Sequence, residues 1–167
     1  TYVLFMGDYG AAAPWNDSSV RGCKRFLERV AGLTDIMTEE PAAKDMEVKI
    51  HKAIKKVSSD IEAMKFNTAI ACLMTLINDI YAVGKISRDD LVIFIKLLCP
   101  FAPHLCEEIW ETIGGEGLLS LSQWPEYEES KTVEDSIEIG VQVNGKVRGT
   151  IVIPNGCAKE EALELAK

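Results

Sequence analysis

The stretch FNTAIACLMTLINDIY, residues 66–81, decides the fold of this chain. Its apolar residues, continued by Val83, form two adjacent lines at helical spacing: Phe66, Ile70, Leu73, Ile77 and Ile80, and beside them Ala69, Cys72, Leu76 and Val83. Only a thin polar seam is left, made of Asn67, Thr75, Asn78 and Asp79. A helix that is apolar around most of its circumference must be covered on most sides. It is also short and interrupted for a bilayer span, so we predict the central helix of a bundle and no membrane partner.

The sequence before and after this stretch also has apolar residues at helical spacing, which predicts the helices that cover the central one. Pro41 is a stop signal, Gly84 follows the central helix, and Ser87 can cap the next one. Residues 1–6, TYVLFM, are typical of the last turns of a helix. The expected helices span about residues 18–37, 43–65, 66–83, 88–99 and 104–113.

The pattern changes after Gly115. Residues 116–135 have no helical period, and we expect an extended strap that lays Leu119, Leu121 and Trp124 on the bundle. Residues 136–154 switch to period two, which indicates strands. The expected fold is mainly α: a helical bundle over 1–125, a linker over 126–135, and over 136–167 a β-hairpin and helix start, the first part of a small truncated α/β domain.

Two sequence rules conflict in the hairpin. Asn144-Gly145 favours a two-residue type I′ turn. The apolar residues of both strands are odd-numbered, however, and they share a face only if the loop has an odd number of residues. We therefore predict a three-residue loop, 143–145, with Gly145 left-handed in a bulge, and a polar face that carries Lys146, Arg148 and Thr150. The predicted pairs are Val141 with Val147 and Ile137 with Ile151.

Composition is that of an ordinary globular protein, with 47% hydrophobic and 26% charged residues. Five cysteines never approach CxxC spacing, and no basic signal-peptide start is present, so we expect a reduced, cytoplasmic protein without a metal site. The formal charge of −8 argues against a generally basic surface. Residues 1–65 are neutral overall, so a polyanion would bind to this first half or to a local basic patch.

Basic residues recur at helical spacing on two of the expected helices. We take them as candidate contacts to a phosphate backbone, together with the two basic residues of the hairpin. The alternative for each stripe is a solvated helix face. The candidates are Arg21, Lys24, Arg25, Arg29, Lys49, Lys52, Lys56, Lys146 and Arg148.

No catalytic constellation is evident. The two histidines are His51, among lysines, and His104, which lies two residues from Cys106 and so points elsewhere on a helix. Glu107-Glu108 is interpreted as a solvated helix face, and residues 144–149, NGKVRG, lack phosphate-loop spacing.

Several segments together resemble bacterial leucyl-tRNA synthetases. FMGDYGAAAPWN with RGCKRFLERV is similar to the segment after the catalytic core of that family, and HKAIKKVSSDIEAMKFNTAIACLM to a helix pair of its anticodon-binding domain. LLCPFAPHLCEEIWETIG followed by Trp124-Pro125 resembles the end of that domain, and VQVNGKVRGTIVIP the start of the C-terminal domain. The resemblance covers nearly the whole chain in one order.

The resemblance implies a tRNA-binding fragment of an enzyme that joins leucine to tRNA(Leu) with ATP and Mg. The ATP signatures and the editing domain of that family are missing here, so it implies no catalytic residue or cofactor in this chain, and we expect the fragment to be inactive and monomeric. Its partners would be tRNA(Leu) and the remaining domains of the parent enzyme. The alternatives are the equivalent bundle of a valyl, isoleucyl or methionyl enzyme, and a helical module that binds only proteins. An independent enzyme lacks a nucleophile–base pair.

Overall fold

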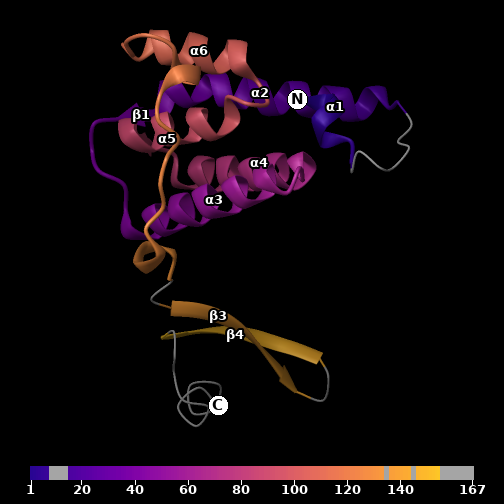
Figure 1. Ribbon diagram of the computed structural model, residues 1–167. Helices are drawn as coiled ribbons and strands as arrows, with labels where there is room; N and C mark the ends of the chain where they lie inside the picture. The colour runs from indigo at the N-terminus through magenta and orange to yellow at the C-terminus, as the bar shows by residue number, and fades with distance from the viewer. Residues whose placement is uncertain (8–14, 134–135, 144–145, 155–167) are drawn as a thin grey trace.

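The computed structural model describes residues 1–7, 15–133, 136–143 and 146–154. It is a helical bundle followed by a strap and a two-stranded hairpin (Figure 1). The α-helices are α1 Tyr2–Phe5, α2 Asp17–Ala31, α3 Lys44–Glu62, α4 Phe66–Val83, α5 Arg88–Leu98 and α6 Pro103–Thr112. The 3₁₀ turns are η1 Gly32–Ile36, η2 Leu119–Leu121 and η3 Glu129–Thr132, and the strands are β1 Met37–Thr38, β2 Ile86–Ser87, β3 Ser136–Val143 and β4 Lys146–Pro154.

Helix α4 is the centre of the core, as its sequence predicts. Ile70, Leu73 and Ile77 are 0% exposed, and α4 contacts α1, α2, α3 and α5. By length and mean hydropathy, 18 residues and 1.4, this helix also satisfies the criteria for a membrane span. Core helices share those properties, and here six residues of α4 are buried against its neighbours.

Helix boundaries follow local capping chemistry. The side chain of Asn16 accepts hydrogen bonds from the backbone of Ser18 and Ser19 and so starts α2, and Ser87 caps α5 in the same way. Gly84 ends α4 at φ 76°, a left-handed conformation that glycine adopts without strain. Our prediction of one helix over 18–37 was wrong at its end, because the chain tightens into η1 after Ala31.

A short parallel pair was not predicted. Met37 pairs with Ile86 and Thr38 with Ser87, so that β1 and β2 join the α2–α3 and α4–α5 connections. Two residues are too few for a period-two pattern to be recognised.

The strap crosses the bundle over α5 toward α3 (Figure 1). The prediction for Leu119 is confirmed, since it is 2% exposed, and Trp124 donates its indole N–H to Ser58 Oγ at 2.8 Å. The prediction for Leu121 was wrong, because its side chain is 82% exposed. The reason is η2: successive residues of a 3₁₀ turn rotate by about 120°, so residues 119 and 121 face different ways.

Glu107 fixes the first half of the strap. Its carboxylate accepts hydrogen bonds from the backbone N–H groups of Leu119 at 2.8 Å and Ser120 at 2.9 Å. These bonds, led by that of Ser120, lower the pKa of Glu107. The solvated-face interpretation was therefore wrong for Glu107, which is a tertiary anchor.

The second half of the strap is attached to α3 by charge. Lys55 Nζ lies 2.6 Å from the Glu129 carboxylate, and Lys131 Nζ lies 3.1 Å from Glu47. The backbone N–H of Glu128 also donates to His51 Nδ1 at 3.1 Å.

The hairpin combines a two-residue connection with odd-to-odd pairing further along the strands, a combination that we did not predict. Val143 pairs with Lys146, so that only residues 144 and 145 lie between the strands, and our predicted three-residue loop was wrong. A register shift then follows between Val141 and Gln142: Gln142 pairs with Val147 and Val141 with Gly149, which leaves Arg148 as an extra residue. Beyond this bulge odd residues pair with odd, Ile139 with Ile151 and Ile137 with Ile153, not in the pairs predicted. The conformation predicted for Gly145 lies outside the described residues.

Candidate nucleic-acid interface

The polar seam of α4 lies open between α2 and α3. Thr75 and Asn78 are exposed and Asp79 is half-buried. Arg29 of α2 donates to Asn78 Oδ1 at 2.7 Å, and Lys49 of α3 contacts Asp79 Oδ1 at 2.7 Å. Residues 78 and 79 point about 100° apart on the helix, so the two predicted basic stripes contact the seam from its two sides, α2 at Asn78 and α3 at Asp79. We call the seven basic residues of the two helices the basic face: Arg21, Lys24, Arg25, Arg29, Lys49, Lys52 and Lys56.

Arg29 is fixed by more than one contact. Its guanidinium lies over the Tyr81 ring, 4.7 Å from the centroid, and the Tyr81 hydroxyl donates to the Arg29 carbonyl at 2.8 Å. The Arg29 side chain is therefore held at the junction of α2 and α4 by stacking and hydrogen bonding.

The α3 part of the basic face borders a shallow groove of about 260 Å³ between α3 and α4. Lys49, Lys52 and Lys56 line it together with Asp79. Lys56 also contacts both oxygens of Asp60, which is 5% exposed and accepts a third hydrogen bond from Thr68 Oγ1 at 2.7 Å. Lys49 and Lys56 therefore already neutralise carboxylates of the bundle, and a phosphate would compete with these partners.

The α2 part is less occupied. Lys24 makes one long ion pair with Glu28, 3.5 Å between exposed side chains. Arg21 and Arg25 are exposed, and neither has an ion pair with another residue that the structure describes. These two guanidinium groups are the members of the basic face best placed to meet a phosphate.

Lys146 and Arg148 belong to β4, Lys146 opposite Val143 and Arg148 at the bulge. Where their side chains point lies outside what the structure describes, so the predicted basic face of the hairpin stays a prediction.

The histidines and the buried thiol are not arranged for catalysis. His51 Nδ1 accepts the N–H of Glu128, and His104 is exposed near the start of α6. Cys106 is 0% exposed, and burial raises the pKa of its thiol well above the usual value. Among the described ranges, 1–7, 15–133, 136–143 and 146–154, no three His, Cys, Asp or Glu side chains are grouped to hold a metal ion.

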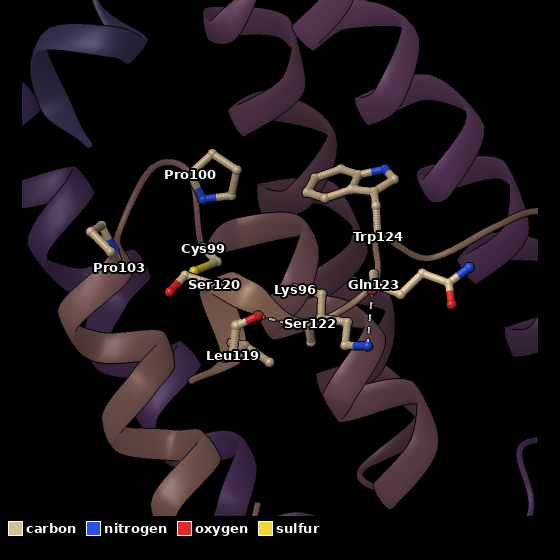
Figure 2. A pocket seen from close by; sticks show the side chains of 9 residues that line it. All are labelled: Lys96, Cys99, Pro100, Pro103, Leu119, Ser120, Ser122, Gln123 and Trp124. Atoms are coloured by element: carbon tan, nitrogen blue, oxygen red, sulfur yellow. Dashed lines mark hydrogen bonds between the residues drawn. The ribbon is translucent and has the colours of Figure 1, made fainter. Parts of the chain in front are cut away.

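An apolar pocket of about 370 Å³ lies between the end of α5, the turn to α6 and the strap. Figure 2 shows Pro100, Pro103 and Trp124 around its opening, and Lys96 Nζ donating to the Gln123 carbonyl at 3.1 Å. Cys99 also lines it, and burial raises the pKa of this thiol. The described lining includes no histidine or carboxylate that could activate the thiol, and Lys96 is engaged by the Gln123 carbonyl, so the pocket does not have the composition of a nucleophilic active site.

Comparison with known proteins matches residues 43–163 to the family model "anticodon-binding domain of tRNA ligase". A leucine–tRNA ligase of Alkaliphilus oremlandii is 44% identical over 153 residues, covering 91% of this chain and 19% of that protein. One from Bdellovibrio bacteriovorus is 42% identical over 173 residues, covering 100% and 22%. The chain therefore spans about a fifth of the length of these curated relatives.

A solved structure has the same fold. The ternary complex of LeuRS, tRNA and LeuAMS from Agrobacterium radiobacter K84 superposes with a TM-score of 0.78 at 32% sequence identity. The match covers 98% of this chain and 24% of that one.

Proposed function

Because this chain belongs to the family of anticodon-binding domains of tRNA ligases, we propose that it is the part of a leucine–tRNA ligase that docks on tRNA(Leu). Its role would be to position the tRNA, while ATP, Mg and leucine are handled by other domains of the parent enzyme in the cytoplasm. The leucine–tRNA ligases among the relatives and the LeuRS–tRNA complex support leucine over valine, isoleucine or methionine. The expected division into a bundle, a linker and a C-terminal unit from residue 136 belongs to this proposal.

The observation that carries the proposal is the basic face on a chain of net charge −8. Lysine and arginine contacts to phosphates fix register and orientation without reading sequence. Within the basic face, Arg21 and Arg25 would bind phosphates directly, because no described carboxylate pairs with them. Lys49 and Lys56 would contribute only to the electrostatic potential in the groove between α3 and α4, because Asp79 and Asp60 already contact them.

Charge reversal tests this role in the intact parent enzyme. We expect Arg21→Glu combined with Arg25→Glu to weaken tRNA binding about tenfold at low salt, for any tRNA sequence. The slope of log K against the logarithm of the salt concentration should become shallower by the amount that about two phosphate contacts contribute. The measurement is a filter-binding or fluorescence titration at several salt concentrations.

The matched control is Lys44→Glu combined with Lys85→Glu, which makes the same change in net charge on a different surface. Lys85 pairs with Glu40 at 2.6 Å, but both side chains are more than half exposed, so the protein should remain folded. Equal losses for both double variants would mean that only net charge matters. No loss for the Arg21/Arg25 variant would show that these residues only form a solvated face.

A second prediction concerns chemistry. We expect the 167-residue chain to give no leucine-dependent exchange between pyrophosphate and ATP and no charging of tRNA, because it lacks the family's ATP signatures. The intact parent enzyme is the positive control in the same assays. Exchange above the background of a boiled sample would contradict the proposal that catalysis resides elsewhere.

A further inference from the structure

One lysine of α3, beside the basic face, is covered by a carboxylate of the strap. Lys55 Nζ contacts both carboxylate oxygens of Glu129, at 2.6 and 2.8 Å, and lies 5.5 Å from the centre of the Tyr127 ring. The hydrogen bond to Glu129 raises the pKa of this lysine. Two oxygens of one anion therefore face the ammonium group of Lys55, as two oxygens of a phosphate do when a lysine binds one.

Lys55 lies at the border of the basic face on α3. Lys52, a member of the basic face, precedes Lys55 by three residues, and residues three apart are neighbours on the surface of a helix. The side chains of both lysines are exposed. A polyanion bound along the basic face would thus have Lys55 at its edge, although Lys55 was not among our sequence candidates.

The carboxylate that covers Lys55 differs from one that neutralises the basic face permanently. Asp60, the partner of Lys56, belongs to α3 itself, and its side chain is 7% exposed. Glu129 belongs to the strap, and its side chain is 67% exposed. Exposed ion pairs contribute little free energy, so a competing anion can displace Glu129 at small cost.

The part of the strap that carries Glu129 is held to the bundle only by surface contacts. None of residues 125–133, all of which the structure describes, is buried. The other described polar contacts of this segment to α3 are one ion pair at Lys131 and one hydrogen bond to His51. Glu129 can therefore leave Lys55 without disturbing the core.

We propose that Glu129 is an autoinhibitory phosphate mimic, which covers Lys55 until a phosphate of the tRNA backbone displaces it. This contact rests on the docking role proposed above and adds a regulated member to the basic face. Because Lys55 must first be uncovered, the pair with Glu129 lowers the affinity of the chain for tRNA. Displacement also removes one attachment of the strap to α3, so tRNA binding and the position of the strap are coupled.

The test is a tRNA titration of the intact parent enzyme at low salt. We expect Glu129→Gln to strengthen binding about twofold to fivefold, because the energy of an exposed ion pair no longer opposes it. Glu126→Gln is the matched control, since it removes the same charge from the same strap. The described contact of Glu126 is with Gln123 of the strap itself, at 3.4 Å, and we expect this control to strengthen binding much less.

Lys55→Gln separates masking of a phosphate contact from loosening of the strap. Glu129→Gln and Lys55→Gln weaken the same attachment, so a loosened strap alone would change the affinity equally in both variants. If Glu129 masks Lys55, Lys55→Gln does not strengthen binding. Adding Glu129→Gln to Lys55→Gln then brings no more gain than adding Glu126→Gln.

The mask and the docking role fail on different variants of the same titration. An unchanged affinity for Glu129→Gln, an equal gain for Glu126→Gln, or a gain that persists without Lys55 would overturn the mask alone. The docking role instead requires Arg21→Glu combined with Arg25→Glu to weaken binding. No effect of that double variant would overturn docking at the basic face, whatever the Glu129 variants do.

Discussion

Replacing Leu73 by alanine is expected to lower the free energy of unfolding by about 2–5 kcal/mol. Leu73 is 0% exposed at the centre of α4, where neighbouring helices cover it on several sides. Truncation loses the burial of the side chain and leaves a cavity that the close-packed bundle can fill only in part. Urea denaturation followed by circular dichroism measures the change, provided that the m value stays constant.

Leu121→Ala is the matched control, since the same atoms are removed from a side chain that is 82% exposed. We expect it to change the unfolding free energy by less than about 0.5 kcal/mol. Similar values for the two variants would contradict the placement of α4 at the centre of the core.

Gly115→Ala is expected to destabilise the chain by about 1–3 kcal/mol. A Cβ at position 115 would lie 2.1 Å from the middle of the Trp110 indole, so the ring or the backbone after α6 would have to move. The indole N–H donates to the Glu116 carbonyl at 3.4 Å, and this hydrogen bond would be strained by the same shift. Thermal unfolding and the tryptophan fluorescence, to which Trp110 contributes, would both report the change.

Gly22→Ala is the opposite case and serves as the control. Position 22 lies inside α2, and a Cβ there would meet nothing within 4 Å. We expect this substitution to stabilise the chain by about 0.5–1 kcal/mol, because alanine loses less backbone entropy in a helix than glycine. A loss of stability equal to that of Gly115→Ala would show that contact with Trp110 is not the cause.

The helices could be predicted from sequence because a period near 3.6 and its caps are local signals. The bounds of α4 were predicted to the residue, and Ser87 and Gly84 mark helix ends as expected. The end of α2 was missed although Gly32, its C-cap, is a helix-stop signal, because Leu33 continues the apolar period of α2 beyond that glycine. In the hairpin we treated a two-residue loop and odd-to-odd pairing as exclusive, and a one-residue bulge at Arg148 allows the first beside the loop and the second beyond the bulge.

The candidate site was predicted only as separate stripes. Spacing along α2 and α3 identified the basic residues, but only the fold brings Arg29 and Lys49 to adjacent residues of α4. The partners that neutralise Lys49 and Lys56 were not recognised, although Asp60 follows Lys56 at the i+4 spacing of a helical ion pair. The tertiary role of Glu107 had no local signal, because its partners lie 12 and 13 residues further along the chain.

The attachment of the strap to α3 determines how far the hairpin can travel. With η3 held to α3 by Lys131 and Glu129, only four Cα–Cα steps separate Thr132 from Ser136, and a chain of that length spans at most about 14 Å. If the strap came off the bundle back to Gly115, the same hairpin could reach roughly 70 Å. A shorter tether confines the hairpin to a smaller volume and raises its effective concentration at any surface beside the bundle. Salt screens exposed ion pairs and so weakens the attachment of the strap to α3. Higher ionic strength therefore increases the distance that the hairpin can reach, in addition to weakening phosphate contacts.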